Sequence, residues 1–302
     1  MNKFEISTDS TSDFYSDEIE KYKLYVGKLD FVKITKDGQT IECKDDFKSY
    51  KDYVDYYTDL SNGVVAKTSI LNLQAHIDLF TQMAKDGIKN AIHISQGMGL
   101  SPTVVNARKA IEEVKKEFPD INYVAIDSNT TTVQEGNLVR IAMDLRDKGK
   151  SLNETVALLE KYKMQTQHFI VVDDLMYLRR GGRISGVAAT FGTLLQLKPI
   201  IEFTKEGKLE VIRKENGIKK AYRSVIEEIK KDYTFHKDYG QAIIVHTNNP
   251  KGAEAMGEMF NEAFGYVPEI RIMGPIIGAH VGPNAVAVTF LSNEQRKYSS
   301  NK

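Results

Sequence analysis

Short apolar runs alternate with longer amphipathic stretches through the first half of this chain, and no other feature constrains its fold as strongly. The apolar runs typical of strands lie at 4–7, 24–34, 91–94 and 123–126. Between them, apolar side chains recur at helical spacing over 47–60, 71–85, 104–117 and 134–148. Strands that alternate with helices predict a largely parallel sheet covered by helices. The expected fold class is therefore α/β.

The pattern changes after a helical stretch at 152–162, and we expect a second α/β domain to begin there. With 302 residues the chain is long enough for two ordinary domains, predicted as 1–162 and 163–302. The later strands are expected at 169–172, 199–203, 209–213, 242–246, 269–272 and 285–291, with a hairpin turn at 204–207 and helices at 219–231 and 250–264. Asn249 before Pro250 predicts the start of the last helix.

Hydroxyl-rich segments follow two of the predicted parallel strands. Residues 7–13 read Ser-Thr-Asp-Ser-Thr-Ser-Asp, and residues 95–103 contain Ser95, Ser101 and Thr103. Ligands of α/β folds gather at the carboxyl ends of the strands, so both segments are expected at the edge of a site. Residues 7–13 have a second interpretation, as a cap for a helix at 15–22, since Ser, Thr and Asp are common N-caps.

The overall charge excludes some partners. The chain has 41 basic and 41 acidic residues, which predicts no surface for nucleic acid. The charged start and the lack of about 20 consecutive apolar residues predict a cytoplasmic protein without a membrane segment. Cys43 is the only cysteine, so no internal disulfide can form. Asp173 and Asp174 are adjacent without a neighbouring His or Glu, and we predict no metal site.

His280 lies in a segment rich in glycine and proline, 274–285, that predicts a tightly bent backbone close to a ligand. A hydrogen-bonded structural histidine is the alternative interpretation. His246 also follows a predicted strand, but its neighbours favour helix capping, and we interpret it as structural.

Three arginines surround a pair of glycines, at Arg179, Arg180 and Arg183. Backbone amides and guanidinium groups here could bind an anion or a partner. A turn at the domain junction, with the arginines paired to acidic side chains, is the alternative.

Gly97 and Gly99 follow a predicted strand and partly match a dinucleotide-binding fingerprint, with Asp127 after the next strand. Pro102 occupies the third glycine position, which weakens the match. This loop nevertheless leaves open a second class of function, a phosphate- or nucleotide-binding enzyme or sensor. No Gly-x-Ser-x-Gly elbow surrounds Ser95 or Ser101, so a serine hydrolase is not favoured.

Six ordered segments together resemble the DegV family of bacterial fatty-acid-binding proteins, which includes the binding subunits of fatty acid kinase. The resemblance covers about residues 4–292. The segments are Ser7–Asp13, Lys67-Thr-Ser69, Ile94-Ser-Gln-Gly-Met-Gly-Leu-Ser101, Asp127-Ser128, Leu178-Arg-Arg-Gly-Gly-Arg-Ile-Ser185 with Lys198-Pro-Ile200, and Gly278-Ala-His-Val-Gly-Pro283. The family implies two packed α/β domains, with one fatty acid in a tunnel near their junction. It also implies a carrier without its own catalysis or cofactor, which presents the carboxylate to a kinase that makes the acyl phosphate.

The resemblance assigns the carboxylate contacts to Ser95, His280, and Thr68 or Ser69. Gly97, Gly278 and Gly282 would shape the supporting loops. Family members commonly show a Ser-Gly-Thr-Tyr-like run where this chain has Gly99-Leu-Ser-Pro102, so the shape of this loop is expected to differ. Kinase-associated members carry an arginine where this chain has Asn216, so kinase coupling is a separate expectation from fatty-acid binding. A buried apolar run is more often plain core than tunnel wall. With that alternative open, the candidates for the tunnel wall are Phe191, Leu194, Leu195, Leu197, Ile200 and Ile201.

Overall fold

The computed structural model describes residues 4–184 and 197–300. The chain divides into two compact units. The first holds Met1–Ile34, Gly38–Lys48 and Ala66–Lys163, and the second holds Thr35–Asp37, Ser49–Val65 and Met164–Lys302. The segment 49–65 thus belongs with the C-terminal part of the chain, although it lies far from it in sequence.

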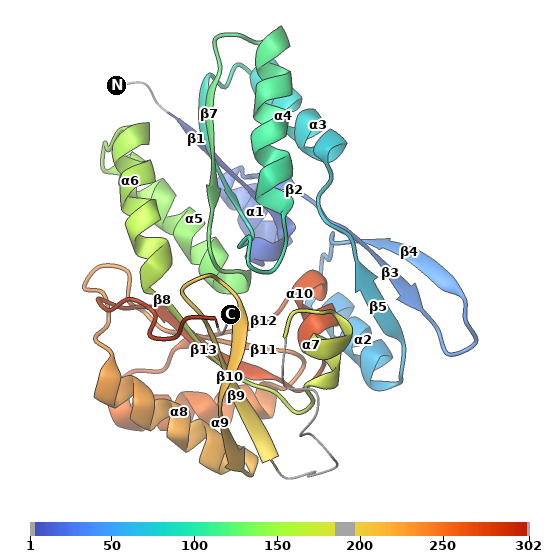
Figure 1. Cartoon of the computed structure of the whole chain (residues 1–302), viewed down its shortest axis with the longest axis vertical. Coiled ribbons are helices and arrows are strands. Elements are labelled where there is room, and N and C mark those ends of the chain that lie inside the picture. Colours follow the sequence, from blue (N-terminus) through green and yellow to red (C-terminus); the bar gives the residue numbers. More distant parts are fainter. Residues whose placement is uncertain (1–3, 185–196, 301–302) are drawn as a thin grey trace. The chain divides into compact units, whose positions relative to one another are not determined.

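A four-stranded parallel sheet organises the first unit, as the sequence predicts. Its strand order is β2 (Tyr25–Gly27), β1 (Glu5–Asp9), β6 (Asn90–Ser95) and β7 (Asn122–Asp127). Helices α3 (Leu73–Lys85) and α4 (Thr103–Glu117) pack on one face, while α5 (Thr132–Asp147) and α6 (Leu152–Tyr162) pack on the other (Figure 1). The core between the sheet and the α3–α4 pair includes Phe80, Val104 and Tyr123.

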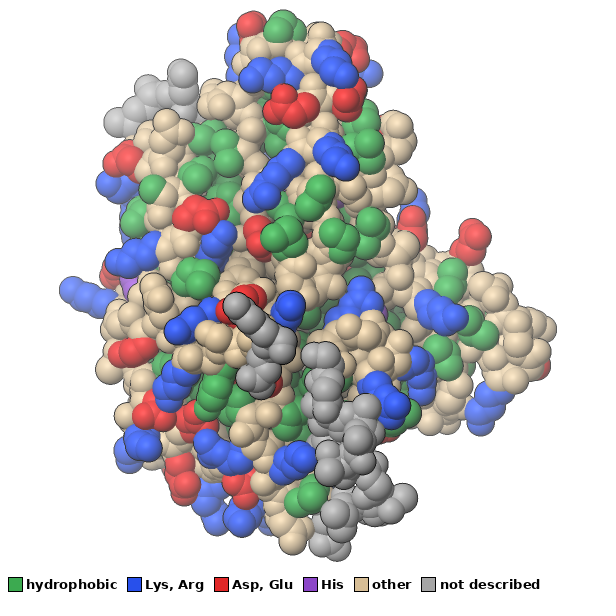
Figure 2. Space-filling view, viewed as in Figure 1, with side chains coloured by type: hydrophobic (Ala, Val, Ile, Leu, Met, Phe, Trp, Pro, Cys, Tyr) green, Lys and Arg blue, Asp and Glu red, His purple; other side chains and the backbone are tan. Residues whose placement is uncertain are grey.

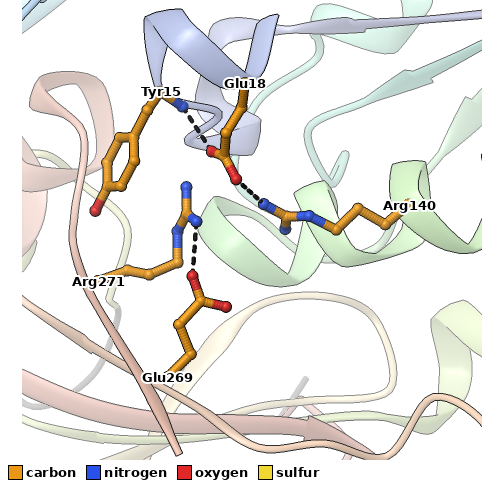
Figure 3. Close-up of polar contacts among 5 residues, drawn as sticks. All are labelled: Tyr15, Glu18, Arg140, Glu269 and Arg271. Carbon is orange, nitrogen blue, oxygen red and sulfur yellow. Dashed lines mark hydrogen bonds and ion pairs between the residues drawn. The ribbon is translucent and has the colours of Figure 1, made fainter. Parts of the chain in front are cut away.

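Helix α1 (Ser16–Tyr22) begins with a capping carboxylate. Glu18 accepts the backbone N–H of Tyr15 at 2.9 Å and pairs with the guanidinium of Arg140 on α5 at 2.6 Å (Figure 3). Within the hydroxyl-rich segment before it, Asp9 instead caps the short 3-10 helix η1 (Ser10–Ser12), because its side chain accepts the N–H of Thr11. Residues 7–13 therefore cap η1 and not α1.

The first unit also holds a small sheet in the order β4 (Thr40–Lys44), β3 (Asp30–Ile34) and β5 (Val65–Thr68). The sequence predicts one strand over 24–34, and this is wrong, since the run divides between the two sheets. The break occurs at Leu29, whose N–H donates to Ser10 Oγ at 3.1 Å and whose carbonyl accepts from Asp45 N–H at 3.0 Å. These hydrogen bonds take the place of the pairing with β1 that would continue β2. The sequence analysis also missed β4 and β5.

The second unit is built on a six-stranded mixed sheet. Its order is β10 (Leu209–Asn216), β9 (Leu197–Phe203), β8 (Thr166–Val171), β13 (Val286–Leu291), β11 (Ile243–His246) and β12 (Glu269–Ile272). Among these strands, as far as the structure describes them, β11 and β12 pair in parallel and the other neighbours pair antiparallel. The predicted β9–β10 hairpin is confirmed. At the start of β12, Arg271 pairs with Glu269 at 2.8 Å (Figure 3).

Helices α8 (Ile218–Asp232) and α9 (Pro250–Phe264) enclose the main core of this unit, which includes Phe169, Tyr222, Phe260 and Phe290. The predicted start of α9 is confirmed, since Asn249 Oδ1 accepts the N–H of Gly252 at 2.9 Å. Asn249 N–H in turn donates to His246 Nδ1 at 3.1 Å. His246 therefore has a structural role beside the capping residue, as the sequence predicts.

Three further helices pack together in the second unit: α2 (Tyr50–Ser61), α7 (Met176–Arg180) and α10 (Pro275–Val281). The bent loop predicted for 274–285 is wrong in part, because residues 275–281 are helical. Pro275 occupies the first turn, where its missing N–H costs nothing, and Gly282 ends the helix with a φ of 78°. Gly278, inside the helix, leaves room for the side chain of Tyr57.

Candidate functional site

Ser95 lies at the carboxyl end of β6 and is fully buried. Its hydroxyl donates to Asp9 Oδ2 at 2.9 Å, and the N–H of Gln96 donates to the same oxygen at 2.9 Å. Asp9 ends the neighbouring parallel strand β1, so the topology alone brings the two side chains to one edge. The structure thus places Ser95 at the strand edge that the sequence predicts.

Gly97 permits a close approach between two loops of this edge. Its N–H donates to Thr130 O at 2.7 Å, and a Cβ built on Gly97 would lie 2.7 Å from Thr130 N and 2.9 Å from Asn129 C. The loop after β7 is itself strained, because Thr132 has a φ of 57° although it is β-branched. The glycine that suggests a dinucleotide fingerprint therefore makes room for backbone of the same unit.

Thr68 and Ser69 line a groove of about 530 Å³ against the small sheet of the first unit. Ser69 donates both its N–H and its hydroxyl to the carbonyl oxygen of Asp30, at 3.0 and 2.8 Å. Its single hydroxyl hydrogen is therefore engaged by the backbone. Other residues that line the groove are Phe31, Glu42, Cys43, Lys44 and Lys67.

His280 lies in the last turn of α10, in the second unit, and is partly buried. Burial first, and then the nearby charge of Arg183, lower the pKa of its imidazole to about 4. At neutral pH the ring is therefore uncharged, with one N–H to donate and one nitrogen that accepts. This suits a fixed hydrogen-bonding group better than a cationic partner for an anion.

Three glycines allow the surrounding helices to approach α10 closely. A Cβ on Gly181 would lie 2.2 Å from His280 Nδ1, one on Gly278 would lie 2.2 Å from the Tyr57 hydroxyl, and one on Gly282 would lie 2.4 Å from the ring of Tyr177. Gly278 therefore lies inside α10 and not in the loop predicted from the sequence, whereas Gly282 forms the turn that ends the helix. Both glycines make space for aromatic side chains.

Two tyrosines of α2 hold the start of α10. The hydroxyl of Tyr57 donates to Met273 O at 2.9 Å, and that of Tyr56 donates to Pro275 O at 2.8 Å. Both rings are buried. Tyr56 and Tyr57 are more than two hundred residues from α10 in sequence, so no local pattern indicates that they bind the helix that carries His280.

The arginines of the predicted anion or partner site divide into two environments. Arg179 and Arg180 are exposed on α7, with the Arg180 guanidinium 5.3 Å from the ring centre of Tyr177. Arg183 is partly buried and donates to the carbonyl oxygen of Gly181. Asn216 is exposed at the end of β10. Ser185, the last residue of the Arg-rich motif, lies outside the described residues.

The adjacent acids have structural partners. Asp173 pairs with Lys198 at 2.7 Å, and Asp174 accepts the N–H of Met176 at the start of α7. Of the tunnel-wall candidates, Ile200 belongs to the core cluster that α8 covers, which favours the plain-core interpretation for this residue. Ile201 is also fully buried. Leu197 is partly buried, whereas Phe191, Leu194 and Leu195 lie outside the described residues.

Two buried acids near Ser95 are not among the residues predicted from the sequence: Asp9, which is its hydrogen-bond partner, and Glu135, a second carboxyl group. Asp9 lies in the hydroxyl-rich segment 7–13, which the sequence already places at the edge of a site, so its position could have been predicted. Glu135 lies on α5, inside what the sequence presents as an ordinary amphipathic helix. Burial, followed by the charge of Asp9, raises the pKa of Glu135 well above its usual value.

Comparison with known proteins identifies the chain. Residues 3–293 match the DegV family, described as "Uncharacterised protein, DegV family". The chain belongs to the DegV family. A DegV domain-containing protein of Clostridium perfringens is 29% identical over 303 residues, which cover 97% of this chain and 99% of that protein.

Solved structures of other DegV proteins share the fold. The fatty acid binding DegV family protein SAG1342 of Streptococcus agalactiae is 27% identical, with a TM-score of 0.77, over 97% of this chain and 100% of that one. The Streptococcus pneumoniae Fatty Acid Kinase (Fak) B3 protein, solved loaded with linoleic acid, is 20% identical. Its TM-score is 0.75, over 96% of this chain and 99% of that one. Both comparisons confirm the α/β fold.

Charged side chains are mixed on the surface. Figure 2 shows basic and acidic groups interspersed on the face drawn, in keeping with the balanced composition. Within residues 4–184 and 197–300, no helix combines the length and the apolar composition needed to cross a bilayer.

Proposed function

We propose that this protein binds one long-chain fatty acid, buries the acyl chain and holds the carboxyl group with Ser95, His280, and Thr68 or Ser69. Membership of the DegV family over residues 3–293 carries this proposal, together with the likeness to the fatty acid binding protein of S. agalactiae at 27% identity. The acyl chain would supply most of the affinity, at roughly 0.8 kcal/mol for each buried methylene.

The chemistry of the candidate residues supports the head-group assignment. A carboxyl group taken out of water needs hydrogen-bond partners, because an unpaired polar group in a buried place is costly. Hydroxyls and an uncharged imidazole provide them. The Ser69 hydroxyl also donates to Asp30 O, and both Thr68 and Ser69 are candidates for this contact. The convergence of these residues on one carboxyl group remains a prediction.

We further propose that the protein is a carrier and that a partner kinase supplies the chemistry. In this role the protein would hold the acceptor in a fixed orientation while the kinase transfers phosphate from ATP to form the acyl phosphate. An ATP-dependent partner would place the protein in the cytoplasm. The exposed Arg179 and Arg180 are the proposed contact with the kinase. Asn216 stands where kinase-associated relatives are expected to carry arginine, so this contact would depend on α7.

Mass spectrometry of an organic extract from freshly purified protein tests the binding. We expect about one mole of fatty acid per mole of protein, and a clear loss in His280→Gln. The matched control is His236→Gln, which changes a histidine outside the proposed site. A protein that carries no lipid, and takes up none from saturated or unsaturated acids, would contradict the proposal. If nucleotides then raised its melting temperature, the Gly97–Gly99 loop would be the better candidate site.

The kinase contact needs a separate measurement. Alanine replacement of Arg179 and Arg180 should leave lipid binding intact but slow acyl phosphate formation by an added fatty acid kinase. Unchanged phosphorylation in the double variant would remove α7 from the proposed contact.

A further inference from the structure

Asp9 is surrounded by hydrogen-bond donors. Its Oδ1 accepts from the N–H of Thr11 at 3.0 Å and from the Thr11 hydroxyl at 2.5 Å, and its Oδ2 accepts from Ser95 Oγ and Gln96 N–H, both at 2.9 Å. Every partner donates, which suits an ionised carboxylate, since that group only accepts. Asp9 is fully buried, so these bonds replace its contact with water.

Glu135 completes a chain of hydrogen bonds to Asp9. The Thr11 oxygen lies 2.8 Å from Glu135 Oε2 and also contacts Asp9. A hydroxyl has one hydrogen, so it can donate to only one of the two acids. Because burial and the charge of Asp9 favour the neutral form of Glu135, this acid donates to Thr11, and Thr11 donates to Asp9. The donations therefore converge on Asp9, from Glu135 through Thr11 on one side and from Ser95 on the other.

The direction of this chain decides what Ser95 can offer a ligand. Its one hydrogen points to Asp9, so its oxygen can only accept from a further partner. Turning the hydrogen away would leave Asp9 with one donor fewer in a buried place, which is unfavourable. A second ionised carboxylate next to Ser95 would also be repelled by Asp9 across a single hydroxyl.

We propose that Asp9 is a positioning residue that fixes Ser95 as a hydrogen-bond acceptor, so that the ligand head group must carry a hydrogen where it meets Ser95. For a fatty acid that atom is the hydroxyl of the neutral carboxyl group. This inference rests on the proposed function and deepens it, because it selects the neutral acid over the carboxylate at Ser95.

Two neutral ligands of equal shape test it. A primary amide of a long-chain fatty acid has hydrogens on its terminal nitrogen, whereas the methyl ketone of the same chain has a methyl group there. The intact protein should bind the amide about tenfold more tightly than the ketone, as expected for one buried hydrogen bond. In Ser95→Ala the two affinities should become similar, which assigns the difference to Ser95.

Variants of the chain then separate positioning from folding. Asp9→Asn should reduce the preference for the amide, because an amide group at position 9 cannot accept from all four donors. Glu135→Gln should keep it, since a neutral side chain with a donor replaces the neutral acid. Glu18→Gln, which breaks the ion pair with Arg140 in the same unit, should lower the melting temperature without changing the preference.

Each result decides between the alternatives. Equal binding of amide and ketone by the intact protein would overturn the inference, and so would binding of the fatty acid with neither analogue bound. A preference that persists in both Ser95→Ala and Asp9→Asn would also overturn it. Failure to bind the fatty acid itself would instead overturn the proposed function. If Asp9→Asn does not fold, the comparison of Glu135→Gln with Ser95→Ala still decides the case.

Discussion

The imidazole of His280 occupies the space that any side chain at position 181 would need, since a Cβ on Gly181 would lie 2.2 Å from Nδ1 and 3.1 Å from Cε1. Both residues belong to the second unit, on α10 and at the end of α7. Gly181, the first of the two glycines between the arginines, therefore leaves room for the ring of His280.

Gly181→Ala should displace His280 and weaken fatty-acid binding by about tenfold, the size expected for one misplaced hydrogen-bond partner. The measurement is a binding titration with a fluorescent fatty acid. Gly182→Asn is the matched control, because nothing lies within 4 Å of a Cβ at position 182 and asparagine tolerates its φ of 68°. Equal affinities of Gly181→Ala and the intact protein would show that His280 does not need this space.

Two glycines inside helices should respond to alanine with opposite signs. A Cβ on Gly278 would overlap the Tyr57 hydroxyl at 2.2 Å, whereas one on Gly257 of α9 would meet only side-chain atoms at 3.6 Å or more. Gly278→Ala should therefore lower the free energy of unfolding by about 1–3 kcal/mol through overpacking. Gly257→Ala should raise it by roughly 0.5–1 kcal/mol through helix propensity. Chemical denaturation of both variants measures this, and a stabilised Gly278→Ala would contradict the packing.

The alternating pattern predicted the parallel sheet because buried parallel strands produce continuous apolar runs. The β2–β3 break could not be predicted, since it depends on bonds from Leu29 to Ser10 and Asp45 that are distant in sequence. Strand β4 carries mostly exposed side chains, so it lacks the apolar run by which strands are recognised.

The candidate site shows the same division between local and distant information. The local pattern predicts Ser95 at the end of a strand, and the structure confirms that it is the last residue of β6. Its partner Asp9 lies on another strand, and Tyr57 meets Gly278 across more than two hundred residues. Composition predicted a bend around His280, but a glycine in a helix and a glycine in a turn look alike in sequence. Only their neighbours distinguish them.

Gly97→Ala should destabilise the first unit. The added carbon would meet the backbone of Asn129 and Thr130 at 2.7–2.9 Å, and backbone atoms cannot move aside as a flexible side chain can. We expect a loss of about 1–3 kcal/mol in the free energy of unfolding. Gly87→Asn in the same unit is the matched control, because nothing lies within 4 Å of a Cβ at position 87 and asparagine tolerates its positive φ of 83° better than alanine. A Gly97→Ala variant as stable as the intact protein would show that the two loops can separate freely.

Glu202 should make the protein less stable as the pH rises. Burial, and then the charge of Glu228, raise the pKa of Glu202 from 4.5 to about 8. A raised folded-state pKa means that the folded protein holds the proton more tightly, so its stabilising effect is complete below pH 4.5 and is lost as the pH rises toward 8. The pKa values of His246 and His280 are lowered to about 4, so these groups change the stability only below pH 6.5.

Between pH 6.5 and 8 the free energy of unfolding of the intact protein should therefore fall by about 2 kcal/mol more than that of Glu202→Gln, at roughly 1.4 kcal/mol per pH unit. Urea unfolding at a series of pH values measures this, with Glu254→Gln on the exposed face of α9 as the control. If Glu202→Gln and Glu254→Gln lost stability in parallel, Glu202 would already be ionised at pH 6.5, and its buried carboxylate would be stabilised by the nearby positive charges of Lys297 and Arg213.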